Sequence, residues 1–194
     1  MDSAHAIYRP SPSGPIHALR QGELLTGLVQ AILDVEFIGK EEEDRIDRKI
    51  HPYAIILTQD CDLEQDFKAR SERNKLDKLI PSVLFCEAVT AESLRGSAGI
   101  TTDIWRRIRI NKDERYQFLQ RIGSVQDAAG QDLPELGIYF KRYFTIPADE
   151  VYRRIELGEA QRRCVLNSPY LEHFCIRFAN YLSRVALPAD HLSE

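Results

Sequence analysis

Short apolar runs of strand type recur along this chain, and long helical segments do not separate them at regular intervals. The strongest runs are residues 53–59 (YAIILTQ), 82–89 (SVLFCEAV) and 136–146 (LGIYFKRYFTI), which are rich in β-branched and aromatic residues. A doubly wound parallel sheet needs a helix after nearly every strand. The pattern therefore predicts an α+β fold, in which helices pack on a small, bent antiparallel sheet or barrel.

The clearest helical pattern lies at the end of the chain, over residues 168–186. Asn167 and Ser168 supply a cap before Pro169 at the first helical position, and Pro188 is expected to stop the helix. Apolar side chains recur at every third or fourth position, namely Leu171, Phe174, Cys175, Phe178, Ala179, Leu182 and Val185. We expect this amphipathic C-terminal helix to pack on the sheet.

Several shorter elements complete the expected domain. Thr101 or Thr102 caps a short amphipathic helix over 101–111, and a second short helix follows Pro147. The remaining strands are expected at 115–122 and 162–166, and residues 22–38 are ambiguous between helix and strand, with strand favoured.

Polar segments interrupt these elements. Residues 1–16 contain three prolines and predict a mobile arm, which leaves 17–194 as a single α+β domain. The charge run 39–50 predicts a solvated loop, and residues 64–78 predict a surface insertion that is helical in part at most.

Composition excludes several classes of protein. The 194 residues carry a net charge of −4, which predicts no general attraction to nucleic acid or anionic membranes. No apolar run approaches the roughly 18–20 residues that span a bilayer, and no signal core precedes the domain. The four cysteines form no CxxC pair. We expect a cytosolic protein with reduced thiols and no membrane partner.

The tripeptide Asp60-Cys61-Asp62 ends the apolar run 53–59 and allows three interpretations. In the first, the two carboxylates hold a sharp turn while the Cys61 thiol fills space in the core. In the second, Cys61, Asp62 and Cys86 bind zinc, if the strands 53–59 and 82–89 are neighbours. In the third, Cys61 is a nucleophile, although flanking carboxylates raise the pKa of a thiol and weaken it. A strand of this length would hold His51 roughly 20 Å from Cys61.

A basic stretch between residues 102 and 124 is the candidate nucleic-acid site. It contains six basic and three acidic side chains, with aromatic residues between them. Basic groups can neutralise phosphates, and aromatic rings can stack on bases. The candidate phosphate-binding residues are Arg106, Arg107, Arg109 and Arg115, and Lys141-Arg142 would extend them. The alternative is a solvated helix face, because Trp105 falls on the apolar side.

Motifs of the common enzyme classes do not occur. The sequence contains no P-loop, GxGxxG, HExxH or GxSxG pattern. His173 lies beside Phe174 in the terminal helix and is expected at the boundary of the apolar face. The sequence therefore favours a protein without catalytic activity or a required cofactor.

The segments GELLTGL (22–28) and HPYAIILTQ (51–59) resemble the opening of MazF/PemK-type toxins. Those proteins begin with a Gly-acid-apolar strand and follow it with an apolar strand that ends in a hydroxyl residue. The resemblance covers about residues 20–60 and implies an SH3-like barrel, with residues 22–28 as a strand.

A longer resemblance rests on ILTQDCDL, NKDERYQFL, YFKRYFTIP and LNSPYLEHFCIRFANYLSRVALP. These segments are similar, in the same order, to an uncharacterised group of bacterial proteins with a Ser/Thr-x-x-Cys-Asp strand end and a C-terminal Ser-Pro-Tyr helix. That group resembles small accessory components of mobile or defence-type operons. The resemblance implies fold and bacterial origin, and it supplies no chemistry.

The leading functional expectation is a non-catalytic, cytosolic bacterial accessory protein that binds another protein, in an anti-phage or toxin–antitoxin type system. Its candidate surfaces are the arm 1–16, the charged loop 39–50 and the insertion 64–78. The alternative is a nucleic-acid-binding or RNA-cleaving protein of MazF-like barrel type, in which the four arginines hold phosphates and Asp60 or Asp62 lies near the chemistry.

Overall fold

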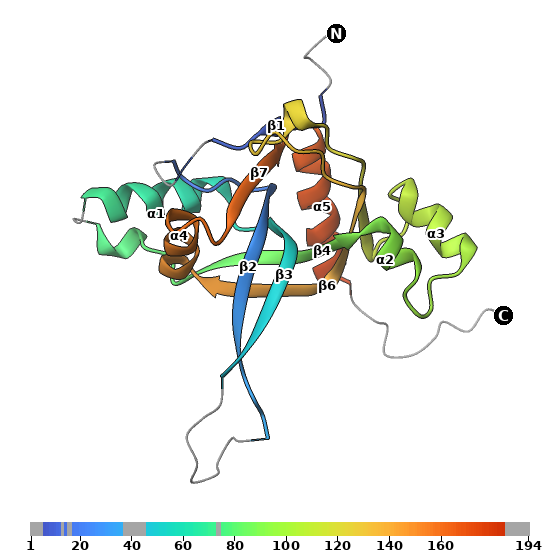
Figure 1. Ribbon diagram of the computed structural model, residues 1–194, viewed down its shortest axis with the longest axis horizontal. Coiled ribbons are helices and arrows are strands. Elements are labelled where there is room, and N and C mark those ends of the chain that lie inside the picture. Colours follow the sequence, from blue (N-terminus) through green and yellow to red (C-terminus); the bar gives the residue numbers. More distant parts are fainter. Residues whose placement is uncertain (1–5, 13, 15–16, 37–45, 73–74, 185–194) are drawn as a thin grey trace, which may run out of the picture.

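Seven strands form one antiparallel sheet in the computed structural model, which describes residues 6–12, 14, 17–36, 46–72 and 75–184. The strand order is β1-β7-β2-β3-β4-β6-β5. The strands are Tyr8–Pro10 (β1), Glu23–Leu33 (β2), Ile46–Ile56 (β3), Ser82–Thr90 (β4), Tyr116–Leu119 (β5), Leu136–Pro147 (β6) and Gln161–Leu166 (β7). The sheet is strongly bent, so that β4 and β6 run across the direction of β2 and β3 (Figure 1). The expected α+β class is confirmed.

Five α-helices accompany the sheet in the described part of the chain. They are Asp60–Glu72 (α1), Ala91–Arg95 (α2), Thr102–Arg109 (α3), Ala148–Glu156 (α4) and Tyr170–Leu182 (α5), with short 3-10 turns at Leu76–Lys78 (η2) and Ser124–Gln126 (η3). The predicted C-terminal helix is confirmed as α5, which is shorter than expected. Within the described ranges, no helix has both the length and the apolar character needed to cross a membrane.

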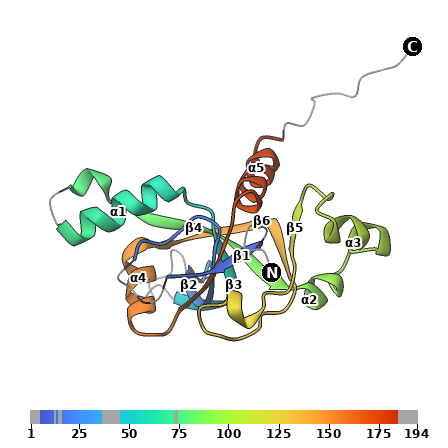
Figure 2. The same cartoon turned by 90° about the horizontal axis from the view of Figure 1, so that it is seen from above.

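Both faces of the sheet are covered, which explains why consecutive strand residues are buried. Leu24 and Ile55 pack in a core with Phe174 and Phe178 of α5. The neighbours of these two residues along the chain are Leu25, Ala54 and Ile56. They pack in a second core on the opposite face, together with Leu63 of α1 and Val151 of α4. Because successive strand residues point to opposite faces, a strand covered on both sides reads as a continuous apolar run. Figure 2 shows α5 and α4 on different sides of the sheet.

The closed SH3-like barrel is not what the structure shows. β1 and β5 are the two edges of the sheet, and no ladder joins them among the described residues. The bend nevertheless brings the edges into contact, because the Tyr8 hydroxyl donates to the carbonyl oxygen of Gln120, just after β5, at 3.1 Å. The sheet is open but strongly curled.

The segment 1–16 is not simply a mobile arm. β1 pairs with β7, the ring of Tyr8 is 2% exposed, and the Ser11 amide donates to the Arg163 carbonyl. The tertiary contact overrides the local signal from the prolines, because a short edge strand tolerates Pro. Residues 1–5, 13, 15 and 16 lie outside the described residues.

The predicted charged loop also needs correction. β3 begins at Ile46, so residues 46–50 belong to a strand that pairs with β2 as far as Leu33. Charged residues are compatible with this strand because residues 46–50 are all exposed. Residues 37–45 lie outside the described residues. Figure 1 shows the resulting hairpin of β2 and β3 extending beyond the rest of the molecule.

Candidate functional site

Asp60 fixes the start of α1 by binding the loop before β2. Its Oδ1 accepts a hydrogen bond from the Gln21 amide at 2.7 Å, and both its oxygens accept hydrogen bonds from the guanidinium of Arg20, at 3.1 and 2.8 Å. An aspartate in the first helical turn is also favoured by the helix dipole. The prediction that both carboxylates hold the exit from the strand is confirmed for Asp60, where a helix begins and not an isolated turn. It is not confirmed for Asp62, which is exposed and, among the described residues, accepts a hydrogen bond only from the Cys61 thiol.

Cys61 is exposed, so the prediction of a thiol in the core is wrong. The alternation expected of a strand does not apply, because Asp60 already lies in α1 and side chains there follow the helical period. The buried positions of this helix are Leu63, Asp66 and Ala69, three residues apart. Residues 64–72 of the predicted surface insertion 64–78 therefore belong to a helix with one face in the core. A 3-10 turn covers Leu76–Lys78, and residues 73–74 lie outside the described residues.

Cys61, Asp62 and Cys86 are not brought together. β3 and β4 are neighbours, as the zinc hypothesis requires, but Cys86 is buried and directs its thiol toward the carbonyl oxygen of Tyr139 on β6. Burial raises the pKa of the Cys86 thiol far above its ordinary value, which disfavours the thiolate that a metal needs. Within the described ranges, no group of three or more His, Cys, Asp and Glu side chains is placed to hold a metal ion.

A second cluster, which the sequence did not reveal, surrounds His51 at the base of the hairpin. The imidazole is 1% exposed and stacks on the ring of Phe144, with 3.8 Å between ring centroids. Its Nε2 lies 3.1 Å from Oε1 of Gln30, and its Nδ1 lies 3.4 Å from Oε1 of Glu87. Nδ1 of His51 and the Glu87 oxygen are close enough for an ion pair, but they are not aligned for a hydrogen bond. Because both ring nitrogens face partners, the imidazole is an anchor for the hairpin.

The Glu87 carboxylate also pairs with one cation on β3 and one on β6. Lys49 of β3 lies 3.3 Å from one oxygen, and Arg142 of β6 lies 3.2 Å from the other. Burial by itself would raise the pKa of Glu87, but these cations and His51 outweigh it, so the pKa is lowered. The pKa of His51 is lowered, first by burial and then by Lys49, against the opposing effect of Glu87. At neutral pH the cluster therefore contains a carboxylate, two cations and a neutral imidazole.

The four candidate arginines divide into two pairs. Arg107 and Arg115 both bind Asp113, which accepts two hydrogen bonds of 3.0 Å from Arg115. Those hydrogen bonds lower the pKa of Asp113, so this carboxylate stays charged. Arg106 pairs with Asp103 on its own helix, and Arg109 has no ion pair in the part of the chain that the structure describes. Three of the four candidate phosphate-binding arginines are therefore paired with carboxylates.

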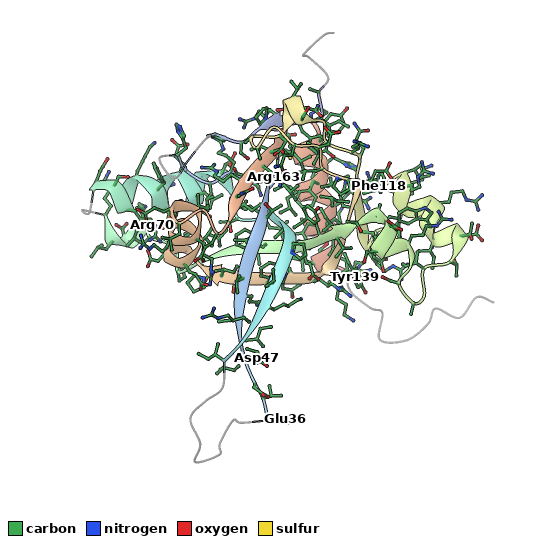
Figure 3. All side chains as sticks on the ribbon, in the orientation of Figure 1. Glu36, Asp47, Arg70, Phe118, Tyr139 and Arg163 are labelled. Atoms are coloured by element: carbon green, nitrogen blue, oxygen red, sulfur yellow. The ribbon has the colours of Figure 1, made fainter. Side chains whose placement is uncertain are left out.

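A groove lies between α3, β5 and the beginning of α5. It consists of two adjoining hollows of about 580 and 460 Å³ that share Arg109, Ile110 and Phe118. The first hollow extends to Ile7, and the second to Trp105. Volumes of this size are typical of ligand sites, which occupy roughly 300–1,000 Å³. Figure 3 labels Phe118 on this side of the molecule.

The side chains around the groove are apolar, neutral polar or basic. Ile110 is 57% exposed and Tyr170 is 37% exposed, so apolar surface is open to solvent. The basic side chains that line the two hollows are those of Arg106, Arg109 and His173, and neither lining includes an Asp or Glu. His173 is exposed on α5, so it lies outside the apolar core, as predicted.

The floor of the groove is held by an unusual loop conformation. Asn111 has a φ of +54° and turns its side chain back onto β5. The Phe118 amide donates to Asn111 Oδ1 at 2.6 Å, and Asn111 Nδ2 donates to the Phe118 carbonyl oxygen at 3.2 Å. Arg177 of α5 then donates to the carbonyl oxygens of Asn111 and Tyr116, at 2.5 and 2.6 Å. These contacts occupy the main-chain groups on the free edge of β5.

No family model, curated protein or solved structure matches the chain. The resemblances to MazF/PemK-type toxins and to the bacterial group with the Ser-Pro-Tyr helix stay predictions. The candidate sites therefore rest on geometry alone.

The sequence identified the arginines of the groove but not its architecture. The basic stretch and its aromatic residues were visible along the chain. The contribution of Ile7 and Tyr170, far away at both ends of the sequence, was not. The one local signal was Asn111 after an amphipathic helix, since Asn is among the residues that adopt a positive φ most readily.

Proposed function

We propose that this protein is a non-catalytic, cytosolic accessory component of a bacterial system, of the anti-phage or toxin–antitoxin type, and that it acts by binding another protein. The β2–β3 hairpin is its main binding surface. The bacterial setting rests on the resemblance of the four segments described above. The binding role rests on one observation, which is an apolar face of the hairpin that stays exposed among the described residues.

The strand register places the apolar side chains of the hairpin on one face. Val29 pairs with Ile50, and Leu33 pairs with Ile46, with Ala31 opposite Arg48 between them. Directly opposed residues of an antiparallel pair share a face, and so do residues two positions apart. Four large apolar side chains therefore form a strip along one side of the hairpin.

This strip is open to solvent. Leu33, Ile46 and Ile50 are 52%, 62% and 66% exposed, and Val35, just beyond β2, is 75% exposed. Isolated apolar residues are common on protein surfaces, but a contiguous apolar patch marks an interaction site. In Figure 3, Asp47 and Glu36 mark the far part of the hairpin, away from the body of the molecule. A partner can therefore contact this strip without disturbing the rest of the fold.

The nucleic-acid alternative has less support from the geometry. Phosphate binding needs several unpaired cations along a track. Three of the four candidate arginines pair with Asp103 or Asp113. Asp60, proposed near the chemistry of an RNA-cleaving site, binds Arg20 and Gln21 instead.

The proposal is tested by capturing partners from the native host with the tagged protein, at moderate salt, and by measuring nucleic acid in the same eluate. Leu33→Asp would place a charge in the strip. Leu157→Asp is a matched control, because Leu157, which directly follows α4, lies outside the strip and is 54% exposed against 52% for Leu33.

The expected result is a stoichiometric protein retained by the wild type and by Leu157→Asp, but not by Leu33→Asp. All three proteins should have the same melting temperature. Retention of nucleic acid without a protein partner, lost at high salt, would contradict the proposal and support the alternative.

A further inference from the structure

The groove between α3, β5 and α5 is separate from the hairpin strip and has a different chemical character. It combines exposed apolar surface with basic side chains and has no Asp or Glu in its lining, in a protein whose net charge is −4. We propose that this groove binds a peptide segment of a partner protein in which apolar side chains flank an aspartate or glutamate. The inference rests on the proposed protein-binding function and adds the chemistry of a second contact.

Charge complementarity selects an acidic ligand. Arg109 projects at the junction of the two hollows, where it lines both, and has no ion pair in the described ranges. An arginine can bind a carboxylate through two parallel hydrogen bonds. The nearby carboxylates Asp103 and Asp113 are already paired with other arginines, so they do not compete for Arg109.

The amount of free charge distinguishes a peptide from a nucleic acid. Binding to a phosphate backbone releases counterions in proportion to the phosphates neutralised, and strong binders contact about six to ten. The groove offers Arg109, which has no ion pair among the described residues, Arg106, which pairs with Asp103, and the exposed His173. Such a set suits one or two carboxylates.

The edge of β5 determines how the ligand is held. An exposed edge strand can bind a peptide by adding a strand through main-chain hydrogen bonds. Here Asn111 occupies the outward amide and carbonyl of Phe118, and Arg177 occupies the carbonyl of Tyr116. The ligand therefore contacts the groove through its side chains, with apolar groups against Ile110 and Phe118 and a carboxylate on Arg109.

The chain contains a built-in probe for this site. Trp105 is the only tryptophan of the protein, and it lines the groove beside Phe118, with 6.2 Å between ring centroids. Occupation of the groove should change its fluorescence. A ligand bound at the hairpin should not.

The experiment begins with a library of random twelve-residue peptides displayed on phage and selected on the whole protein. Enriched peptides are synthesised and titrated while the Trp105 emission is followed. Arg109→Glu reverses the charge in the groove, and Arg95→Glu is the matched control, since Arg95 is an exposed residue of α2 that lines neither hollow.

The expected peptides combine apolar residues with Asp or Glu. Arg109→Glu should weaken their binding at least tenfold, and Arg95→Glu should leave it unchanged. Replacing the acidic residue of a peptide with lysine should weaken binding to the wild type and restore binding to Arg109→Glu. Failure to enrich acidic apolar peptides, or equal binding to wild type and Arg109→Glu, would overturn the inference.

A twelve-residue oligouridylate is titrated in parallel. Salt-sensitive binding that changes the Trp105 emission and is lost in Arg109→Glu would overturn the inference in favour of nucleic acid. Leu33→Asp separates the two proposals, because it should abolish capture of the host partner and leave peptide binding unchanged. Normal capture by the hairpin with no peptide bound in the groove would reject the inference alone.

Discussion

Nδ1 of His51 and Oε1 of Glu87 lie 3.4 Å apart inside the protein, where the hairpin leaves the sheet. The two residues come from neighbouring strands, and Lys49 and Arg142 complete the cluster from the solvent side. The contact joins the root of the proposed binding hairpin to the core. The position of the hairpin should therefore depend on the charge state of this cluster.

Acidification should destabilise the protein partly through His51. Its pKa in the folded state lies below the ordinary value of 6.5, so the unfolded chain binds a proton more readily. This stabilising contribution is complete above pH 6.5 and is lost as the pH falls towards the folded pKa. We expect His51→Gln to reduce the difference in unfolding free energy between pH 7.5 and pH 5.5, measured with urea. An unchanged difference would exclude His51 as the titrating group.

Gly27 should tolerate alanine poorly. Its φ is +76°, and a Cβ atom there would lie 2.5 Å from the main-chain oxygen of Glu159. Gly99 has a similar φ of +85° but open space around it, so it is a matched control. Gly99→Ala should cost about 1 kcal/mol from backbone strain. Gly27→Ala should cost clearly more, about 2–4 kcal/mol, in urea unfolding. Equal losses would show that the neighbouring chain moves aside freely.

The buried pair of Arg162 and Glu23 should be sensitive to removal of one partner. Two hydrogen bonds of 2.7 and 2.9 Å join the side chains, and Glu23 is fully buried. Arg162→Met would leave a buried carboxylate without its cation, which costs about 3–5 kcal/mol. Glu23→Gln in the same chain should recover part of that loss, because it removes the unpaired charge. The two variants and the double variant are compared by chemical unfolding, and strictly additive losses would contradict the pairing.

Removal of the Asn111 side chain should expose the edge of β5. Asn111→Gly keeps a residue that adopts positive φ easily but loses both hydrogen bonds to Phe118. Since unpaired edges promote association, we expect a concentration-dependent increase in sedimentation coefficient. Asn111→Asp is the control that retains the acceptor for the Phe118 amide. A monomeric Asn111→Gly at every concentration would show that the edge needs no such protection.

The cysteines should react in order of exposure. Burial raises the pKa of Cys175 to about 11 and that of Cys164 to about 12, so at pH 8 roughly one Cys175 thiol in a thousand is ionised. We expect a thiol reagent to modify exposed Cys61 first, and Cys61→Ala to change the unfolding free energy by less than about 0.5 kcal/mol. Protection of Cys61 by stoichiometric zinc would instead support the predicted metal site.

The sequence by itself determined the local elements. The strands predicted at 82–89 and 136–146 occur at Ser82–Thr90 and Leu136–Pro147, and the helix predicted at 101–111 occurs at Thr102–Arg109. Thr101 caps that helix, as expected, by accepting a hydrogen bond from the Ile104 amide. These predictions succeed because the periodicity of apolar residues and the capping of helices depend on residues that are close together in the sequence.

The burial of one face of α1 could not be predicted from the local sequence. Residues 60–72 are too polar to indicate a buried helix, yet Leu63, Asp66 and Ala69 are buried against the sheet. Asp66 is acceptable there because Arg70 donates to one of its oxygens and the Ile80 amide to the other. The partner at Ile80 lies fourteen residues away, so no local pattern reveals it.

Only the tertiary structure decided which residues share a site. The bend of the sheet places Ile7 beside Phe118 in one groove, and the strand order places His51 beside Glu87. It also separates Cys61 in α1 from Cys86 in β4, although β3, which precedes α1, pairs with β4. Local propensity sets the conformation of each segment. The strand order is selected by the burial of side chains on both faces of the sheet. The strand order then determines which distant residues come into contact.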